Sequence, residues 1–419
     1  AMAIRDGKII ELGPDRQILN KYRYKQSIDA AGKDIYPGFI DAHGHLFSYA
    51  ELKLGANLLG SKSEEEMLKR VHEYQEKANR KIIIGSGWDQ SLWGQSVLPN
   101  NTRLNEEFPN IPVLLYRIDG HSALINQKFI DLLDEADFEV RGGEVLFSNG
   151  KPNGMFIDAA LSILEPYIPV YDSKEIRKQL IGIQKELFGF GITGVHEAGI
   201  DFDELELLKQ MVGNGDLSLN IYAMLNPTKE NRVFALENGV FRLKNLSVRS
   251  FKAYIDGALG SSGALLKRDY EDKPAYQGLC LMNSEELNEL GEFCLDVGYQ
   301  LNSHGIGDSA ISIILDMCSN IYNRKPDHRF RIEHAQIVDP EDLHKFGDYA
   351  VFPSVQPTHA TTDQRWVQSK IGKQRMTGAY AFKSLKNQLG MIALGTDFPV
   401  EYTNPFYTIH AAVHRMNNK

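Results

Sequence analysis

Two histidines stand one residue apart in the stretch PGFIDAHGHL, residues 37–46. Alternate residues of a strand point to the same face, so His43 and His45 converge if residues 39–45 form a strand. Gly44 between them adds no side chain and lets a ligand or another backbone come close. Converging neutral imidazoles can begin a zinc, manganese or iron site, although such a pair also occurs as structural histidines in a turn. A metal site therefore requires further ligands from the rest of the chain.

Four later apolar runs each end near a polar residue that could supply such a ligand. These residues are Lys252 in FKAYIDG, His304 in LNSHGIGD, His334 in RIEHAQ and Asp397 in ALGTDFP. Taken singly, a histidine at a strand end is often a hydrogen-bonded structural residue, and the aspartate fits a turn. Four histidines, a lysine and an aspartate at one rim are hard to explain as packing, because burying so many polar groups without partners is costly.

Lysine is the unusual member of this set. An ammonium group repels metal ions, but a neutral amine can react with carbon dioxide to give a carbamate, which is an anionic oxygen ligand. Lys252 would need a desolvated or cation-rich environment for its neutral form to be accessible. The alternative is an ion pair between Lys252 and a nearby acid such as Asp256.

The elements that must position these residues alternate between strand-like and helix-like segments. After the H-x-H strand, apolar runs ending in polar or glycine residues occur at 191–199, 218–225, 248–257, 298–308, 329–339, 350–360 and 390–401. Eight alternating units indicate a parallel sheet closed into a (β/α)₈ TIM-like barrel, whose active sites lie at the strand C-terminal ends. An open doubly wound sheet is the alternative, but no G-x-G-x-x-G follows an early strand. One intervening helix is expected over 173–191, with Ser173 as its N-cap.

Two regions do not follow this rhythm. The stretch MAIRDGKIIELG predicts a hairpin with its turn at Asp6-Gly7, and such a hairpin needs a sheet to join. Residues 57–155 predict a mixed insertion after barrel strand one, with polar, Trp-rich turns over the barrel mouth.

Composition narrows the class of protein. The 419 residues carry a net charge of -9 and contain no Lys/Arg-rich run, which argues against nucleic acid or an anionic membrane surface as a partner. No apolar run reaches membrane-spanning length. The three cysteines, Cys280, Cys294 and Cys318, include no C-x-x-C, so we expect neither a disulfide framework nor a thiolate zinc site, and infer a reducing, cytoplasmic setting. Oligomeric state is open, with a homodimer the general expectation.

The ordered ligands and several longer stretches resemble the amidohydrolase superfamily, in particular its amidohydrolase 3 or YtcJ-like branch, which includes N-substituted formamide deformylase. The stretches are PGFIDAHGH, GSGWD, DGHSALIN, GITGVHEAG, FKAYIDGALGSSGALL, SHGIGDSAI, RIEHAQ, SVQPTHATTD and GTDFPVEYTNPF. They cover nearly the whole chain in order.

The resemblance implies a binuclear centre, with zinc the expected metal. His43, His45 and Asp397 would hold one ion, and His304 and His334 the second, with carbamylated Lys252 and a hydroxide bridging them. Asp397 would accept the proton of the attacking hydroxide and pass it to the leaving nitrogen.

Five further residues would contact a small-molecule substrate by the same resemblance: Trp88, Asp89, His121, His196 and His359.

The resemblance also implies a small β-sandwich domain built from both termini. Residues 1–36 would be its N-terminal part and 37–414 the hydrolase barrel, with 57–155 inserted over the active site. The C-terminal strands of the sandwich are not evident in this sequence.

The sequence thus predicts a metal-dependent hydrolase that cleaves an amide or N-acyl C–N bond of a small molecule. One alternative is a mononuclear deaminase-type enzyme or a lactone or ester hydrolase, with Lys252 unmodified. Another is a non-catalytic assembly protein, which usually lacks some of the ligands.

Overall fold

The computed structural model describes residues 1–416 apart from 95–97, 119, 134–137, 141–142 and 170, several of which fall in the expected insertion. The chain divides into two compact units, Ala1–Gly38 and Phe39–Lys419. In the first, strands β1 (Met2–Arg5) and β2 (Lys8–Leu12) pair antiparallel and are followed by helix α1 (Asp15–Lys21). Asp6 and Gly7 both have positive φ, as a tight hairpin turn requires. The hairpin is confirmed, and the β-sandwich around it stays a prediction.

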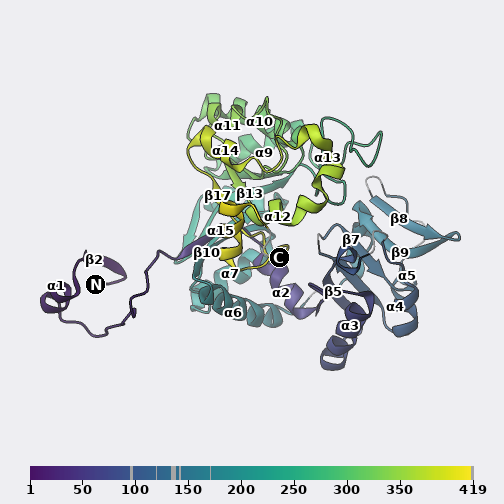
Figure 1. Ribbon diagram of the computed structural model, residues 1–419, viewed down its shortest axis with the longest axis horizontal. Helices are drawn as coiled ribbons and strands as arrows, with labels where there is room; N and C mark the ends of the chain where they lie inside the picture. Colours follow the sequence, from purple (N-terminus) through teal and green to yellow (C-terminus); the bar gives the residue numbers. More distant parts are fainter. Residues whose placement is uncertain (95–97, 119, 134–137, 141–142, 170, 417–419) are drawn as a thin grey trace. The chain divides into compact units, whose positions relative to one another are not determined.

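The second unit contains the expected barrel (Figure 1). Its parallel strands, in chain order, are β3 (Phe39–Gly44), β10 (Ile192–Ile200), β11 (Asn220–Leu225), β13 (Leu246–Tyr254), β14 (Gln300–Gly305), β15 (Arg331–His334), β16 (Phe352–Val355) and β17 (Ala393–Leu394). Beyond β17 the chain bonds back to the first strand: the amide of Asp397 donates to the His43 carbonyl at 2.8 Å, and the amide of His45 to the Phe398 carbonyl at 2.9 Å. The sheet therefore nearly closes, and the doubly wound alternative is wrong.

Helices follow the strands, as the alternation predicts. They are α2 (Leu46–Leu54), α6 (Ser173–Gly189), α7 (Phe202–Asn214), α8 (Lys229–Asn238), α9 (Ser284–Asp296), α10 (Asp308–Arg324), α11 (Lys345–Asp348), α12 (Pro357–Thr362), α13 (Val367–Arg375), α14 (Phe382–Leu389) and α15 (Pro405–His414). Figure 1 shows α9, α10, α11 and α14 grouped beside β13 and β17. Ser173 is not the N-cap of α6: it is the first helical residue, and Asp172 caps the helix by accepting from the Lys174 amide at 2.8 Å. Both residue types suit a cap, so the sequence left the position one residue ambiguous.

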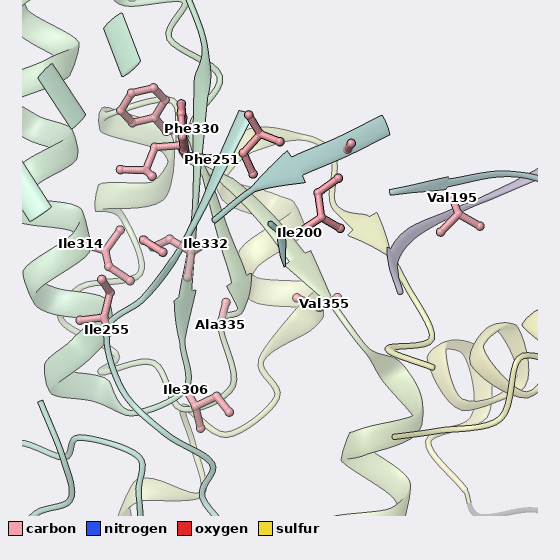
Figure 2. Close-up of a cluster of buried hydrophobic side chains, with 14 of the residues drawn as sticks. Val195, Ile200, Phe251, Ile255, Ile306, Ile314, Phe330, Ile332, Ala335 and Val355 are labelled. Carbon is pink, nitrogen blue, oxygen red and sulfur yellow. The ribbon is translucent and has the colours of Figure 1, made fainter. Parts of the chain in front are cut away.

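The apolar core lies between the strands and these helices. Figure 2 shows Phe251 of β13, Ile332 of β15 and Phe330, which directly precedes β15, in one cluster with Ile314 of α10. Residues next to these in sequence, including Lys252, Arg331 and Glu333, are buried and polar. Since strand side chains alternate between faces, the apolar face meets the helices and the polar face lines the barrel interior. This interior differs from the Val, Ile and Leu layers usual in such barrels.

The insertion forms its own sheet, with strand order β4-β5-β6-β7-β9-β8. Its elements are β4 (Ala56–Asn57), α3 (Glu64–Ala78), β5 (Ile83–Trp88), α4 (Thr102–Glu107), β6 (Val113–Arg117), β7 (Ser122–Ile125), α5 (Gln127–Ile130), β8 (Gly143–Ser148) and β9 (Lys151–Asp158). Two apolar clusters cover this sheet, which makes it a packed subdomain rather than a set of loops.

Among the described residues, no helix combines the length and the apolar character needed to cross a membrane.

Candidate metal centre

The six expected ligands meet at the C-terminal ends of the barrel strands. One donor atom from each of His43, His334 and Asp397 lies within 4.8 Å of the other two, and all three residues are buried. Oδ1 of Asp397 is 3.5 Å from Nε2 of His43 and 3.2 Å from Nε2 of His45. Nζ of Lys252 lies 3.3 Å from Nε2 of His43. Side chains from β3, β13, β15 and the segment after β17 therefore converge on one point.

His304 joins the cluster from β14. Its ring centroid is 4.5 Å from that of His334. Its Nε2 is buried, lies 3.5 Å from Oδ1 of Asp256, and makes no hydrogen bond within the described chain. A buried nitrogen without a partner is costly in an apo protein, and a metal ion would remove that cost.

Local backbone geometry aims two of these ligands. His334, the last residue of β15, and Asp397, three residues after β17, have φ values of 72° and 61°, in the left-handed region that non-glycine residues rarely adopt. Such conformations persist where surrounding contacts enforce them, and they gather at functional sites. Gly44 serves the same geometry, because a Cβ there would clash with the ring of Phe398, next to Asp397. The close approach expected at Gly44 is thus made by a side chain.

A carboxylate that sequence reasoning missed fixes the orientation of His43. Oε2 of Glu333 lies 2.5 Å from Nδ1 of His43, so that nitrogen donates and Nε2 keeps its lone pair. Arg331 holds Glu333 in turn, with Nε 2.7 Å from Oε1 and Nη2 2.9 Å from Oε2. Although burial opposes it, the charge of Arg331 and the hydrogen bond from His43 keep the pKa of Glu333 well below its usual range. Carboxylate–histidine pairs of this kind orient metal ligands in proteins.

His334 and the first strand have comparable supports. Nδ1 of His334 lies 2.8 Å from Oε1 of Gln356, which leaves Nε2 of His334 free to bind a metal. Asp41 accepts hydrogen bonds from the His43 amide and from both the amide and the hydroxyl of Thr396. These bonds tie the H-x-H strand to the segment that carries Asp397.

The electrostatics of the cluster suit a divalent cation. Burial, with the charge of Lys252, lowers the pKa of His43 to about 4, and burial lowers the pKa of Lys252 to about 8. Asp397 has a pKa well below its ordinary value, because the neighbouring histidines outweigh the effect of its burial. Neutral imidazoles, an ionised carboxylate and a lysine whose neutral form is accessible are nitrogen and oxygen donors of the kind that zinc binds. The residues present therefore fit a metal centre.

Two of the expected substrate contacts, His196 and His359, border this centre. Nη1 of Arg331 donates to Nδ1 of His196 at 2.8 Å, which places the proton of the neutral His196 ring on Nε2. Burial and Arg331 lower the pKa of His196 to about 3. Nε2 of His359 lies 3.6 Å from Oδ2 of Asp397, and the His359 ring stacks with that of His334 at 6.2 Å.

His121 comes from the insertion. Its Nδ1 lies 3.2 Å from Oδ1 of Asp158, whose own amide donates to the His121 carbonyl at 2.8 Å. Burial lowers the pKa of His304, and Lys252 and His121 lower it further. The insertion therefore presents His121 within electrostatic range of the centre.

Trp88 and Asp89 are placed differently. Trp88 is fully buried in the insertion core and donates from Nε1 to the Leu115 carbonyl at 2.7 Å, so the structure puts it in packing instead of a pocket wall. Asp89 is also buried, and its two oxygens lie 3.2 Å from Nη2 of Arg117 and of Arg365. Arg365 follows α12, so Asp89 joins the insertion to the barrel.

With this barrel and this rim described, comparison with known proteins gives the family. The model of the amidohydrolase family matches residues 26–419, and the chain belongs to that family. It is 31% identical to the protein LONG AFTER FAR-RED 3 of Arabidopsis thaliana over all of this chain and 75% of that protein. It is 23% identical to the N-substituted formamide deformylase of Arthrobacter pascens over 84% of this chain and 68% of that enzyme.

A solved structure supports the same fold. An uncharacterized metal-dependent hydrolase from Pyrococcus horikoshii superposes with a TM-score of 0.77 at 27% identity, covering 99% of this chain and 82% of that one. The family and this neighbour together support a metal-dependent hydrolase activity.

Proposed function

We propose that this protein hydrolyses an amide or N-acyl C–N bond of a small molecule at the rim centre. The observation that carries the proposal is the buried convergence of His43, His334 and Asp397, with Lys252 and His45 in direct contact with it. The resemblance to a formamide deformylase favours a C–N bond over a lactone or ester.

The metal ions are zinc in this proposal, two per chain, with Lys252 carrying a carbamate. When bound, divalent ions lower the pKa of a water molecule and polarise a carbonyl group. The low pKa of Asp397 keeps its carboxylate ionised, so it can take a proton from the attacking water and deliver it to the leaving nitrogen. His196 offers its Nε2 proton to the substrate, and His121 and His359 supply further polar contacts.

Two broader expectations accompany this function. The substrate is a free small molecule, and we propose a homodimer in the cytoplasm. Cys280, Cys294 and Cys318 are all free thiols, which supports a reducing setting.

Elemental analysis of the purified protein, combined with a panel of N-formyl amides, N-acyl amines, lactones and aminated heterocycles, tests the proposal. We expect bound zinc, a carbamate on Lys252 in the native mass, and C–N hydrolysis that chelation abolishes and zinc restores. One ion per chain with an unmodified Lys252 and deamination would favour the mononuclear alternative.

A non-catalytic role is the second candidate, because the Arabidopsis relative has a name that states no enzymatic activity. Metal-free protein from metal-replete cells, inert toward the whole panel, would favour that role over hydrolysis.

A further inference from the structure

A second polar site lies at the other end of the barrel. A cavity of about 300 Å³ is bordered by Arg249, Gln300, Lys325, Asp327, His328 and Arg329. Gln300 begins β14, and residues 325–329 lead into β15. Because the barrel strands are parallel, the beginnings of β14 and β15 lie at the end opposite to His304 and His334. The cavity shares no residue with the metal centre.

Two titratable residues of this cavity, Asp327 and His328, are not available to bind a charged ligand. Asp327 is occupied by Arg329, whose Nε and Nη2 lie 2.8 and 3.2 Å from its two oxygens. His328 has both ring nitrogens in hydrogen bonds, Nε2 with the Tyr349 carbonyl at 2.7 Å and Nδ1 with the Phe330 amide at 2.9 Å. Burial lowers the pKa of His328, so it is neutral at pH 7.

Arg249 and Lys325 are the cations left over. Within the described chain, neither side chain has an ion pair or a hydrogen bond, and Nε of Arg249 is buried without an acceptor. A guanidinium group donates but cannot accept, so it needs an acceptor, and an anion is the acceptor that also matches its charge. Three cations face one carboxylate here, on a chain whose net charge is -9.

The walls of the cavity are held in place before any ligand arrives. Nε2 of Gln300 donates to the Arg329 carbonyl at 2.5 Å, and the hydroxyl of Tyr222 donates to Oε1 of Gln300. The bonds of His328 fix the same loop to Tyr349. A preformed wall reduces the ordering cost of binding.

We propose that this cavity binds a small oxyanion of the phosphate class through Arg249 and Lys325. Arginine matches tetrahedral oxyanions with paired N–H donors, and lysine adds a point charge. The anion is either free phosphate or the phosphate group of a small metabolite, since both present the same oxygens. The site goes beyond the proposed hydrolysis and does not depend on it.

Calorimetric titration of the full-length protein tests this site at constant ionic strength, because screening alters binding between charges. The titrants are inorganic phosphate, glucose 6-phosphate and, as a neutral control, glucose. Arg249→Gln and the double variant Arg249→Gln/Lys325→Gln are compared with Arg242→Gln, which changes an exposed arginine on the strand β12 (Phe241–Leu243) paired with β13. Circular dichroism checks that each variant is folded.

We expect saturable phosphate binding that Arg249→Gln weakens by about 10-fold or more, the effect of one charge-assisted hydrogen bond, while Arg242→Gln leaves it unchanged. Tighter binding of glucose 6-phosphate than of phosphate would assign the site to a phosphorylated metabolite, and equal binding to free phosphate. Phosphate bound at the metal centre would be insensitive to Arg249, so binding that survives in the double variant overturns the proposal. Absence of saturable binding to the wild type also overturns it, whatever the hydrolase assays show.

Discussion

The barrel rim and the insertion both bury polar and aromatic residues that a sequence reader would choose as functional, but they use them differently. At the rim, His43, His334 and Asp397 converge with their donor atoms facing one another. In the insertion, Trp88 packs in a core and Asp89 forms ion pairs with two arginines. Parallel strands bring their C-terminal ends together by topology, so a strand-end position predicts where a side chain lies. The insertion has a mixed sheet and no such rule.

The comparison makes its strongest prediction for Asp397→Ala, which removes the rim's ionised carboxylate. We expect loss of bound metal and a fall in hydrolysis of more than about 100-fold, since even changes behind the ligands cost 10–100-fold. Metal analysis and steady-state rates measure this, with the exposed Asp296→Ala as the matched control. Full metal content in Asp397→Ala would show that Asp397 is not a metal ligand and would contradict a metal site at the rim.

For the insertion, Trp88→Ala should act on stability. Truncating a fully buried tryptophan leaves a cavity and removes its bond to Leu115, which costs about 3–5 kcal/mol of unfolding free energy. Urea unfolding measures the loss, and metal content per folded chain should not change. A raised KM without loss of stability would instead show that Trp88 contacts the substrate.

Glu333→Gln tests the residue that orients the expected metal ligand His43 and leaves His43 itself unchanged. The glutamine side chain has nearly the same shape as glutamate but no negative charge. It therefore accepts less strongly from Nδ1 of His43, and the tautomer with the lone pair on Nε2 is less favoured. Zinc affinity should fall by about 10–100-fold with the fold retained. Competition with a metal-binding dye gives the affinity, and an unchanged value would mean that His43 is oriented by other contacts.

The smallest effect expected is a dependence of the unfolding free energy on pH that arises from Glu197. This buried residue of β10 has a structural role. It accepts from the Leu46 and Phe47 amides at the start of α2, and burial raises its pKa to about 8. Between the unfolded pKa, near 4.5, and about 8 the folded chain keeps a proton that the unfolded chain releases, so stability falls as pH rises.

Unfolding free energy should therefore drop by about 2 kcal/mol from pH 6 to pH 8 because of this group. In Glu197→Gln, which carries no titrating proton, the slope should flatten. The same slope in the variant and the wild type would assign it to other residues.

Much of the barrel could be predicted because the apolar run of each strand ends in, or is closely followed by, a polar or glycine residue. The same signal located His43, Lys252, His304, His334 and Asp397. It did not reveal Glu333 or Arg331, which lie before the end of β15 and whose partners are nearly 300 residues away. Nor did it place Trp88, because burial in a separate core depends on strand pairing that a local pattern does not encode.

The seam between the first and last barrel strands has a consequence for biosynthesis. His43 and Asp397 meet only when residues separated by most of the chain are joined, and Gly395 packs against the His43 backbone there. A nascent polypeptide thus cannot bring His43 and Asp397 together until residues 43–397 have all left the ribosome, so metal binding at the proposed centre would come late in folding.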